Sequence, residues 1–71
     1  MHISYKGFGI SPGALHLSDS DEWEALVTIT KYIDGTYQDI PYTDDKTFGS
    51  REEAENRAIE IGKHIIDTGL N

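Results

Sequence analysis

The pair Asp34-Gly35, set between two runs of strand-forming residues, constrains the fold of this chain more than any other feature. The run before it, Trp23 to Ile33, is rich in β-branched and aromatic residues and alternates apolar with polar side chains. Asp-Gly is a strong signal for a two-residue type I′ turn, because both central residues of that turn need positive φ. The sequence therefore predicts an antiparallel hairpin whose second strand runs from Thr36 to Thr43.

A helix from Ser20 through Tyr32 is the alternative interpretation of the first run, because Ser20 could cap it and acidic residues would occupy its first turn. The four residues from Val27 to Thr30 are all β-branched, and such residues lose side-chain freedom in a helix. We therefore expect a strand here.

The two-residue turn also sets the register of the hairpin and the face on which each side chain lies. Ile33 should oppose Thr36, and Tyr32 should oppose Tyr37. One face then carries side chains that a helix can cover: Ala25, Val27, Ile29, Ile40 and Tyr42. The other face stays open and carries Thr30, Asp39 and the candidate partner-binding residues Leu26, Thr28, Tyr32, Tyr37 and Pro41.

A capping box from Ser50 to Glu53 predicts the start of a helix, because the Ser50 hydroxyl can accept a hydrogen bond from the Glu53 amide. Apolar residues follow at helical spacing, at Ala54, Ala58, Ile61 and Ile65, with Ile59, Gly62 and Ile66 beside them. Gly69 is placed to end the helix in the left-handed conformation, after which Leu70 can fold back. We expect an amphipathic helix over residues 51–68.

The N-terminal part gives a weaker strand pattern, from Ile3 to Ser11, in which Gly7 and Gly9 indicate a bulge or bend. Pro12-Gly13 is typical of a turn, and a short continuation of the strand follows from Ala14 to Leu17. The predicted fold is a single α+β domain over residues 1–71. It has a three-stranded antiparallel sheet with one C-terminal helix packed on one face, in the order β-β-β-α.

The amino-acid composition excludes several kinds of site and makes some partners unexpected. The chain has 71 residues and no cysteine, which excludes disulfides and thiolate metal sites and makes self-association the natural support for a small core. Its net charge of -7 repels phosphate and anionic lipid, so nucleic acid and membranes are not expected partners. No signal peptide or membrane span is recognisable, and we expect a cytoplasmic protein.

The polar clusters match no catalytic or metal-binding pattern. The acidic segment Asp19 to Glu24 has Trp23 and Glu24 where a calcium-binding EF-hand loop needs a ligand and a glycine. Asp44-Asp45 is interpreted as a turn before the helix. The three histidines, His2, His16 and His64, lack the second ligand or the nucleophile that a metal or catalytic site needs. We expect no enzymatic activity, no metal and no cofactor.

Four short motifs carry a resemblance to known proteins. They are Tyr5-Lys6-Gly7-Phe8 with Ile10, Trp23-Glu24-Ala25 with Val27 and Ile29, Phe48 and Ser50 before Glu52-Glu53-Ala54, and Ile65-Ile66-Asp67. In these motifs nearly the whole chain resembles a group of small proteobacterial β-β-β-α proteins without assigned chemistry. The resemblance implies the fold and no activity.

The predicted topology is also similar to two families of known function. In AP2 and integrase N-terminal DNA-binding domains, whose pattern Trp23, Ala25, Phe48 and Ala54 echo, the sheet presents arginines to DNA. Trp23 to Thr43 contains one basic residue, Lys31. HicB-type antitoxins, which bind protein partners, have a Pro-Asp-x-Pro-Gly-Cys segment where this chain has Ile40-Pro41-Tyr42.

Together these patterns predict a non-catalytic protein-interaction domain that binds a protein partner or a second copy of itself, through the open sheet face or a sheet edge. Tyr32 and Tyr37 would lie at the centre of that surface. The alternative is nucleic-acid binding, with phosphate contacts from Lys31, Arg51, Arg57 and Lys63.

Overall fold

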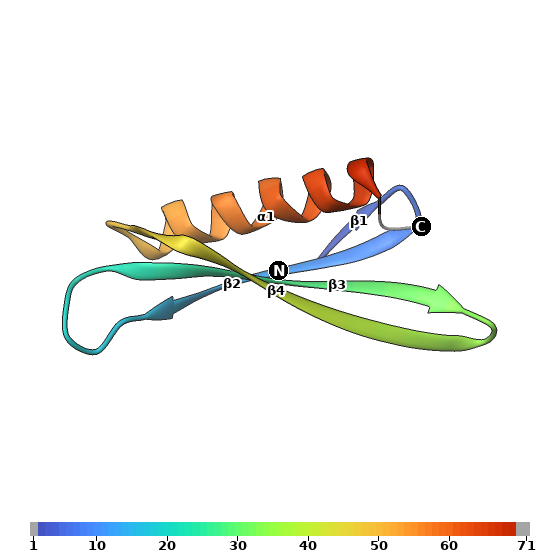
Figure 1. Cartoon of the computed structure of the whole chain (residues 1–71), viewed down its shortest axis with the longest axis horizontal. Coiled ribbons are helices and arrows are strands. Elements are labelled where there is room, and N and C mark those ends of the chain that lie inside the picture. The colour runs from blue at the N-terminus through green and yellow to red at the C-terminus, as the bar shows by residue number, and fades with distance from the viewer. Residues whose placement is uncertain (1, 70–71) are drawn as a thin grey trace.

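The computed structural model describes residues 2–69 as a four-stranded antiparallel sheet with one C-terminal helix on one of its faces (Figure 1). The strands are β1 (Ile3–Tyr5), β2 (Phe8–His16), β3 (Trp23–Ile33) and β4 (Thr36–Phe48), and the helix is α1 (Arg51–Thr68). Strands that follow one another in sequence are neighbours in the sheet. The α+β class and the helix bounds are confirmed, whereas the prediction of three strands is wrong.

The additional strand comes from a tight turn at Lys6-Gly7. The segment from Ile3 to Ser11, predicted as one strand with a bulge or bend, folds back on itself, so that Tyr5 pairs with Phe8. Lys6 has a φ of 50° and Gly7 a φ of 84°. Both values are positive, as a type I′ turn requires, and a lysine rarely takes this conformation.

The predicted turn at Pro12-Gly13 is also wrong, because both residues lie inside β2 and pair with Val27 and Leu26 of β3. Proline lacks the amide hydrogen that a central strand needs, and it is tolerated where one side of the strand is free. Among the described residues, β1 ends its pairing with β2 at Ile10, so no described strand pairs with Pro12 on that side.

The register predicted for the β3–β4 hairpin is confirmed from Ile33↔Thr36 to Val27↔Tyr42. β4 continues beyond its predicted end at Thr43, however, and runs to Phe48. The segment from Asp44 to Lys46, predicted as a turn before the helix, is instead a bulge within β4, because Leu26 pairs with Thr43 and Glu24 pairs with Thr47.

The helix begins as its capping box predicts, with the Ser50 hydroxyl accepting a hydrogen bond from the Glu53 amide at 3.2 Å. At its end the Gly69 amide donates to the Ile65 carbonyl at 3.2 Å. Gly69 has a φ of 161°, so the predicted left-handed conformation is wrong. The predicted contact of Leu70 lies outside the described residues.

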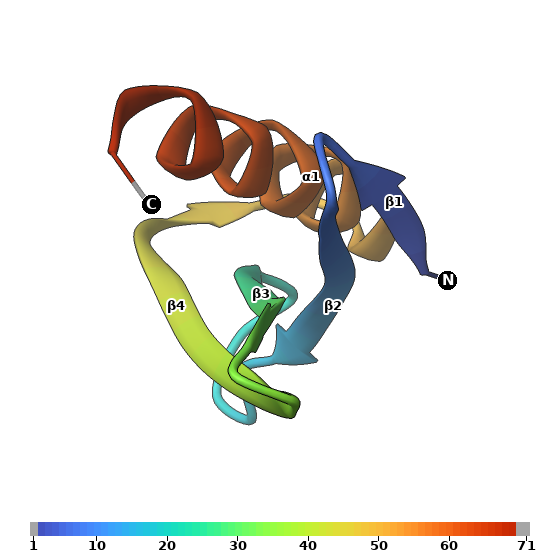
Figure 2. The same cartoon turned by 90° about the vertical axis from the view of Figure 1, so that its right-hand side faces the viewer.

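The core lies between α1 and the covered face of the sheet, and Figure 2 shows the helix on one side of the strands. The helix contributes small residues along its buried stripe, which lets its backbone approach the sheet closely. The buried stripe is Ala54, Ala58, Gly62 and Ile66, and the sheet opposes it with Ile10, Ala25, Val27 and Ile29. In the described part of the chain, two large side chains are fully buried, Ile10 and Ile29, so the core is thin.

The tip of the β3–β4 hairpin projects beyond the rest of the molecule (Figure 1). The pairing of β2 with β3 begins at Gly9↔Thr30, so the hairpin beyond Thr30 is a ribbon of two strands. This ribbon helps to give the molecule its elongated extents of 43 × 20 × 19 Å.

Candidate functional site

The face of the sheet opposite α1 is formed by alternate residues of β2, β3 and β4. We call these positions the open face, and they are Gly9, Ser11, Gly13, Leu15, Glu24, Leu26, Thr28, Thr30, Tyr32, Tyr37, Asp39, Pro41, Thr43 and Thr47. All five candidate partner-binding residues from the sequence lie here. Their placement on one face is confirmed, and their role in binding remains a prediction.

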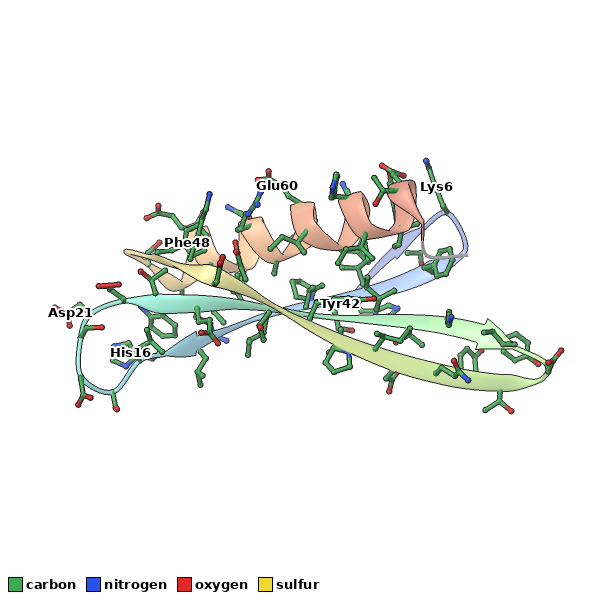
Figure 3. The ribbon with its side chains drawn as sticks, in the orientation of Figure 1. Lys6, His16, Asp21, Tyr42, Phe48 and Glu60 are labelled. Atoms are coloured by element: carbon green, nitrogen blue, oxygen red, sulfur yellow. The ribbon has the colours of Figure 1, made fainter. Side chains whose placement is uncertain are left out.

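The open face carries little charge for so acidic a chain. Two of its positions are ionisable at neutral pH, Glu24 and Asp39. The exposed Asp39 carboxylate accepts a hydrogen bond from the Thr30 hydroxyl at 2.8 Å. The outer surface of α1, by contrast, is charged, and Figure 3 shows Glu60 pointing away from the sheet. Burial of the open face therefore desolvates few charges.

Large hydrophobic side chains gather on the open face. Leu15 is 50% exposed, Tyr32 60% and Tyr37 73%, and all three point to this side. The two tyrosine rings contact each other across the strands, with centroids 4.9 Å apart and planes tilted by 43°. A fourth exposed hydrophobic residue, Ile33, is 39% exposed and lies on the opposite face of the ribbon.

A shallow groove of about 280 Å³ lies beside the tyrosines, at the end of the open face nearest the hairpin tip. We call it the tyrosine groove, and it is lined by His2, Ser4, Gly7, Phe8, Gly9, Thr30, Tyr32 and Tyr37. The His2 ring lies directly over Gly9, where a Cβ atom would come within 2.7 Å of it. His2 Nδ1 and the Ser11 hydroxyl oxygen are 3.3 Å apart, which holds the ring against the sheet.

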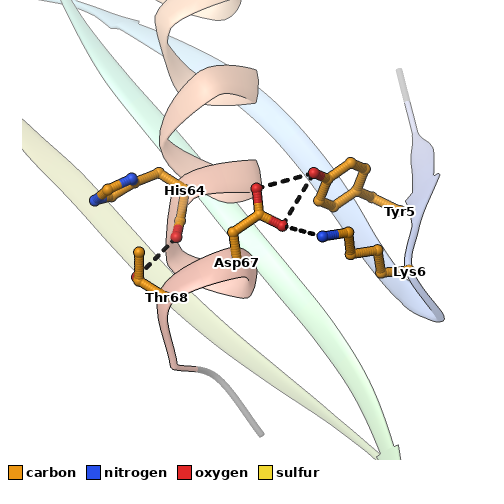
Figure 4. Close-up of polar contacts among 5 residues, drawn as sticks. All are labelled: Tyr5, Lys6, His64, Asp67 and Thr68. Atoms are coloured by element: carbon orange, nitrogen blue, oxygen red, sulfur yellow. Dashed lines mark hydrogen bonds and ion pairs between the residues drawn. The ribbon is translucent and has the colours of Figure 1, made fainter.

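A polar cluster fixes the turn that forms the rim of this groove (Figure 4). The Tyr5 hydroxyl donates to both carboxylate oxygens of Asp67 at 3.0 Å, and the Lys6 ammonium contacts the same carboxylate at 2.7 Å. The hydrogen bonds from Lys6 and Tyr5 lower the pKa of Asp67, and the bond to Asp67 raises the pKa of both partners. The side chains of Tyr5 and Lys6 thus connect the β1–β2 turn to the end of α1.

The edge along β4, and the part of β2 beyond its pairing with β1, carry features that oppose pairing with another strand, and β1 itself offers an edge of only three residues. On β4, Thr28↔Pro41 is a non-hydrogen-bonded pair by the alternation that starts at the turn, so the proline nitrogen faces the free edge. The bulge at Asp44 to Lys46 interrupts the same edge. On β2, Pro12 lies in the part beyond the pairing with β1.

A second cleft, of about 500 Å³, lies between β4 and α1 and is lined by Thr43, Asp44, Arg57, Glu60, Ile61 and His64. Arg57 contacts Asp44 at 3.2 Å and Glu60 at 3.9 Å, so its charge is compensated by two carboxylates. Burial by itself would raise the pKa of Asp44, but hydrogen bonds from Arg57 and the Lys46 amide outweigh it and the pKa is lowered. This ion pair fastens the β4 bulge to the helix.

The remaining polar residues that the sequence singled out have structural contacts. The His16 ring lies 4.7 Å from the Trp23 ring, centroid to centroid. In the acidic segment, the Leu17 amide donates to the Glu22 carbonyl at 3.0 Å, and Glu22 accepts a hydrogen bond from the Thr47 hydroxyl. Within residues 2–69, no three His, Asp or Glu side chains are grouped as metal ligands.

The four basic residues of the nucleic-acid alternative do not gather on the open face. Lys31 lies on the opposite side of β3, and Arg51, Arg57 and Lys63 lie on α1. Sequence reasoning missed Leu15 because Pro12-Gly13 was interpreted as a turn. It missed Gly9 because this glycine was interpreted as part of a bulge or bend, and it considered His2 only as a metal or catalytic residue. The alternation of Gly9, Ser11, Gly13 and Leu15 was the signal that could have placed Leu15 on this face.

No protein-family model matches the chain, and no curated protein sequence matches it. In the part of the chain that the structure describes, no helix is both long enough and apolar enough to cross a membrane.

Proposed function

We propose that this protein is a non-catalytic interaction domain that associates with a second copy of itself through the open face. The observation that carries the proposal is that three of the four large hydrophobic side chains exposed in the described residues, Leu15, Tyr32 and Tyr37, lie on one face with little charge. Tyrosines that are exposed in the free protein often anchor interfaces, because each ring buries a large area at a small cost in side-chain entropy. The edge alternative has less support, since Pro41 and a bulge interrupt the β4 edge, Pro12 interrupts the part of β2 beyond β1, and β1 has only three residues.

The size of the open face supports a dimer. β3 has 11 residues, which span about 36 Å at the usual rise, and three strands cover about 14 Å across the sheet. Each copy therefore offers on the order of 500 Å², and two copies bury about 1,000 Å², the lower limit for a specific interface. A second sheet would also add apolar contacts to a chain with a thin core.

Charge predicts how this association depends on salt. Each copy carries a net charge of -7, so two copies repel each other at low ionic strength. Added salt screens that repulsion, and the dimer should become more stable between about 50 and 500 mM salt. Nucleic-acid binding would respond in the opposite direction, because salt weakens contacts to phosphate.

Sedimentation equilibrium of the whole chain at low and high salt tests the proposal. Changing Tyr32 and Tyr37 together to serine should weaken the dimer by at least about tenfold, because interface aromatics contribute more than 1 kcal/mol each when buried. Circular dichroism should show that the helix is retained. A variant that dimerises as strongly as the wild type would contradict the proposal.

Ile33→Ser is the matched control. It removes an exposed hydrophobic side chain from the same ribbon but from the face opposite the tyrosines. Self-association should be unchanged in this variant. An equal loss in Ile33→Ser and in the tyrosine variant would show that the ribbon, and not the open face, mediates association.

A further inference from the structure

The open face carries a protruding side chain and a hollow at equal distances from its middle. Leu15 pairs with Glu24, which is four residues before Thr28 on β3. Tyr32, which borders the tyrosine groove, is four residues after Thr28. The same spacing holds about Ser11, the partner of Thr28, because Leu15 follows it by four residues on β2 and Gly7, in the turn that precedes β2 and in the groove lining, precedes it by four.

Two identical faces can be stacked by a twofold axis that lies between the sheets. One such axis runs perpendicular to the strands, through the Ser11–Thr28 pair. It places β2 of one copy over β2 of the other, and the two strands then run in opposite directions. Leu15 of one copy then comes over Gly7 of the other, at the tyrosine groove. The groove holds about 280 Å³, while loss of a leucine side chain from a core leaves roughly 150 Å³, so the leucine fits.

We infer that the dimer is built this way, with Leu15 of each copy inserted in the tyrosine groove of the other; the inference rests on the proposed function. Leu15 and the pair Tyr32 and Tyr37 are then covered in both copies, because the twofold axis repeats the same contact. Glu24 of the second copy comes opposite Tyr32, whose hydroxyl is a hydrogen-bond donor. The Glu24 carboxylate therefore faces a donor and not a second carboxylate.

The other twofold stacking, with the axis along the strands, leaves these features unmatched. It places the tyrosine ends of the two copies together and both Leu15 side chains at the far end. The grooves would then face each other empty, and a carboxylate at Glu24 would lie near its own symmetry mate.

The absence of cysteine makes the two arrangements easy to distinguish by a single engineered label. Thr36, at the hairpin tip, lies on the side of the ribbon away from the tyrosines, so Thr36→Cys can carry a nitroxide without obstructing the open face. Its partner Ile33 is five residues beyond Thr28, or about 17 Å along β3. Double electron–electron resonance should therefore find the two labels about 35 Å apart.

A distance of about 25 Å or less, roughly that of labels on the outer sides of two sheets about 10 Å apart with like ends together, would overturn the inference and leave the proposed function standing. A chain that stays monomeric at millimolar concentration would overturn both. These two outcomes separate the arrangement of the dimer from its existence.

Leu15→Ala provides the second measurement. Leu15 is half exposed, so its truncation should leave the fold intact, and dimerisation should weaken on the order of 50-fold because two leucines are lost per dimer. Ile33→Ala is the control at a comparably exposed position outside the interface and should leave the affinity unchanged. A dimer with the long distance that tolerates Leu15→Ala would show that the groove has another occupant.

Discussion

Gly62 is the position where the packing of α1 on the sheet is most sharply testable. A Cβ atom at this position would lie 3.0 Å from Ile10 Cγ2, 3.2 Å from Val27 Cγ2 and 3.3 Å from Ile10 Cδ1. All three distances are shorter than the 3.5–4.0 Å at which carbon atoms attract each other best. Gly62→Ala therefore adds a methyl group that the side chains of Ile10 and Val27 can accommodate only by moving away.

Two opposing effects set the change in the free energy of unfolding that Gly62→Ala causes. Alanine is a better helix former than glycine by about 1 kcal/mol, which favours the variant. Overpacking costs about 1–3 kcal/mol, and here the upper part of that range applies, because Ile10 and Val27 are stiff, buried side chains on a sheet. We expect a net loss of about 1 kcal/mol, which corresponds to a melting temperature about 4–8 °C lower for a domain of this size.

Urea denaturation followed by circular dichroism measures this loss, at a protein concentration low enough to keep the chain monomeric. Val27→Ala removes Val27 Cγ2, one of the atoms that the new methyl group would contact. The loss of free energy of unfolding in the double variant should therefore be about 1 kcal/mol smaller than the sum of the losses in the two single variants. A Gly62→Ala protein more stable than the wild type would refute the close approach of helix and sheet.

Two further predictions concern the ends of the helix. Ser50→Ala should reduce the free energy of unfolding by about 1 kcal/mol, because the Glu53 amide loses its acceptor, and Ser50→Asp should retain stability in the same urea experiment. Asp67→Asn should lower the urea midpoint at pH 7, where the carboxylate accepts from Tyr5 and Lys6. Because those contacts lower the pKa of Asp67, its contribution is present above the ordinary pKa and is lost as the pH falls through the lowered value. Wild type and Asp67→Asn should therefore converge as the pH falls through the lowered pKa of Asp67, and a difference in stability that persists in stronger acid would contradict the role of the charge.

The features that could be predicted from the sequence are those set by residues close together in the chain. Asp34-Gly35 determined the hairpin register through the positive φ of its two residues, of 51° and 81°. Ser50 and Glu53 determined where α1 begins, through a hydrogen bond across one turn. With the register known, alternation placed Tyr32 and Tyr37 on one face, so five residues of the candidate surface were found before the structure.

The features that could not be predicted depend on contacts between distant segments. Lys6 takes a positive φ in the β1–β2 turn while Asp67, 61 positions away, holds its ammonium group. β4 continues past Asp44 while Arg57 of α1 binds the carboxylate at the bulge. Neither partner is visible in the local pattern, which in both places is that of an ordinary bend or turn.

The sequence by itself determined the class of fold, the central hairpin, the helix and the face on which the tyrosines lie, because turn geometry and capping act over a few residues. Only the tertiary structure decided that the N-terminal segment is a hairpin and that Pro12 lies inside a strand, beyond its pairing with β1. Those two outcomes bring Leu15 and the tyrosine groove onto one face, at equal distances from its middle. That surface depends on the pairing of β2 with both β1 and β3. The sequence of one strand does not show which residues of the neighbouring strands lie beside it.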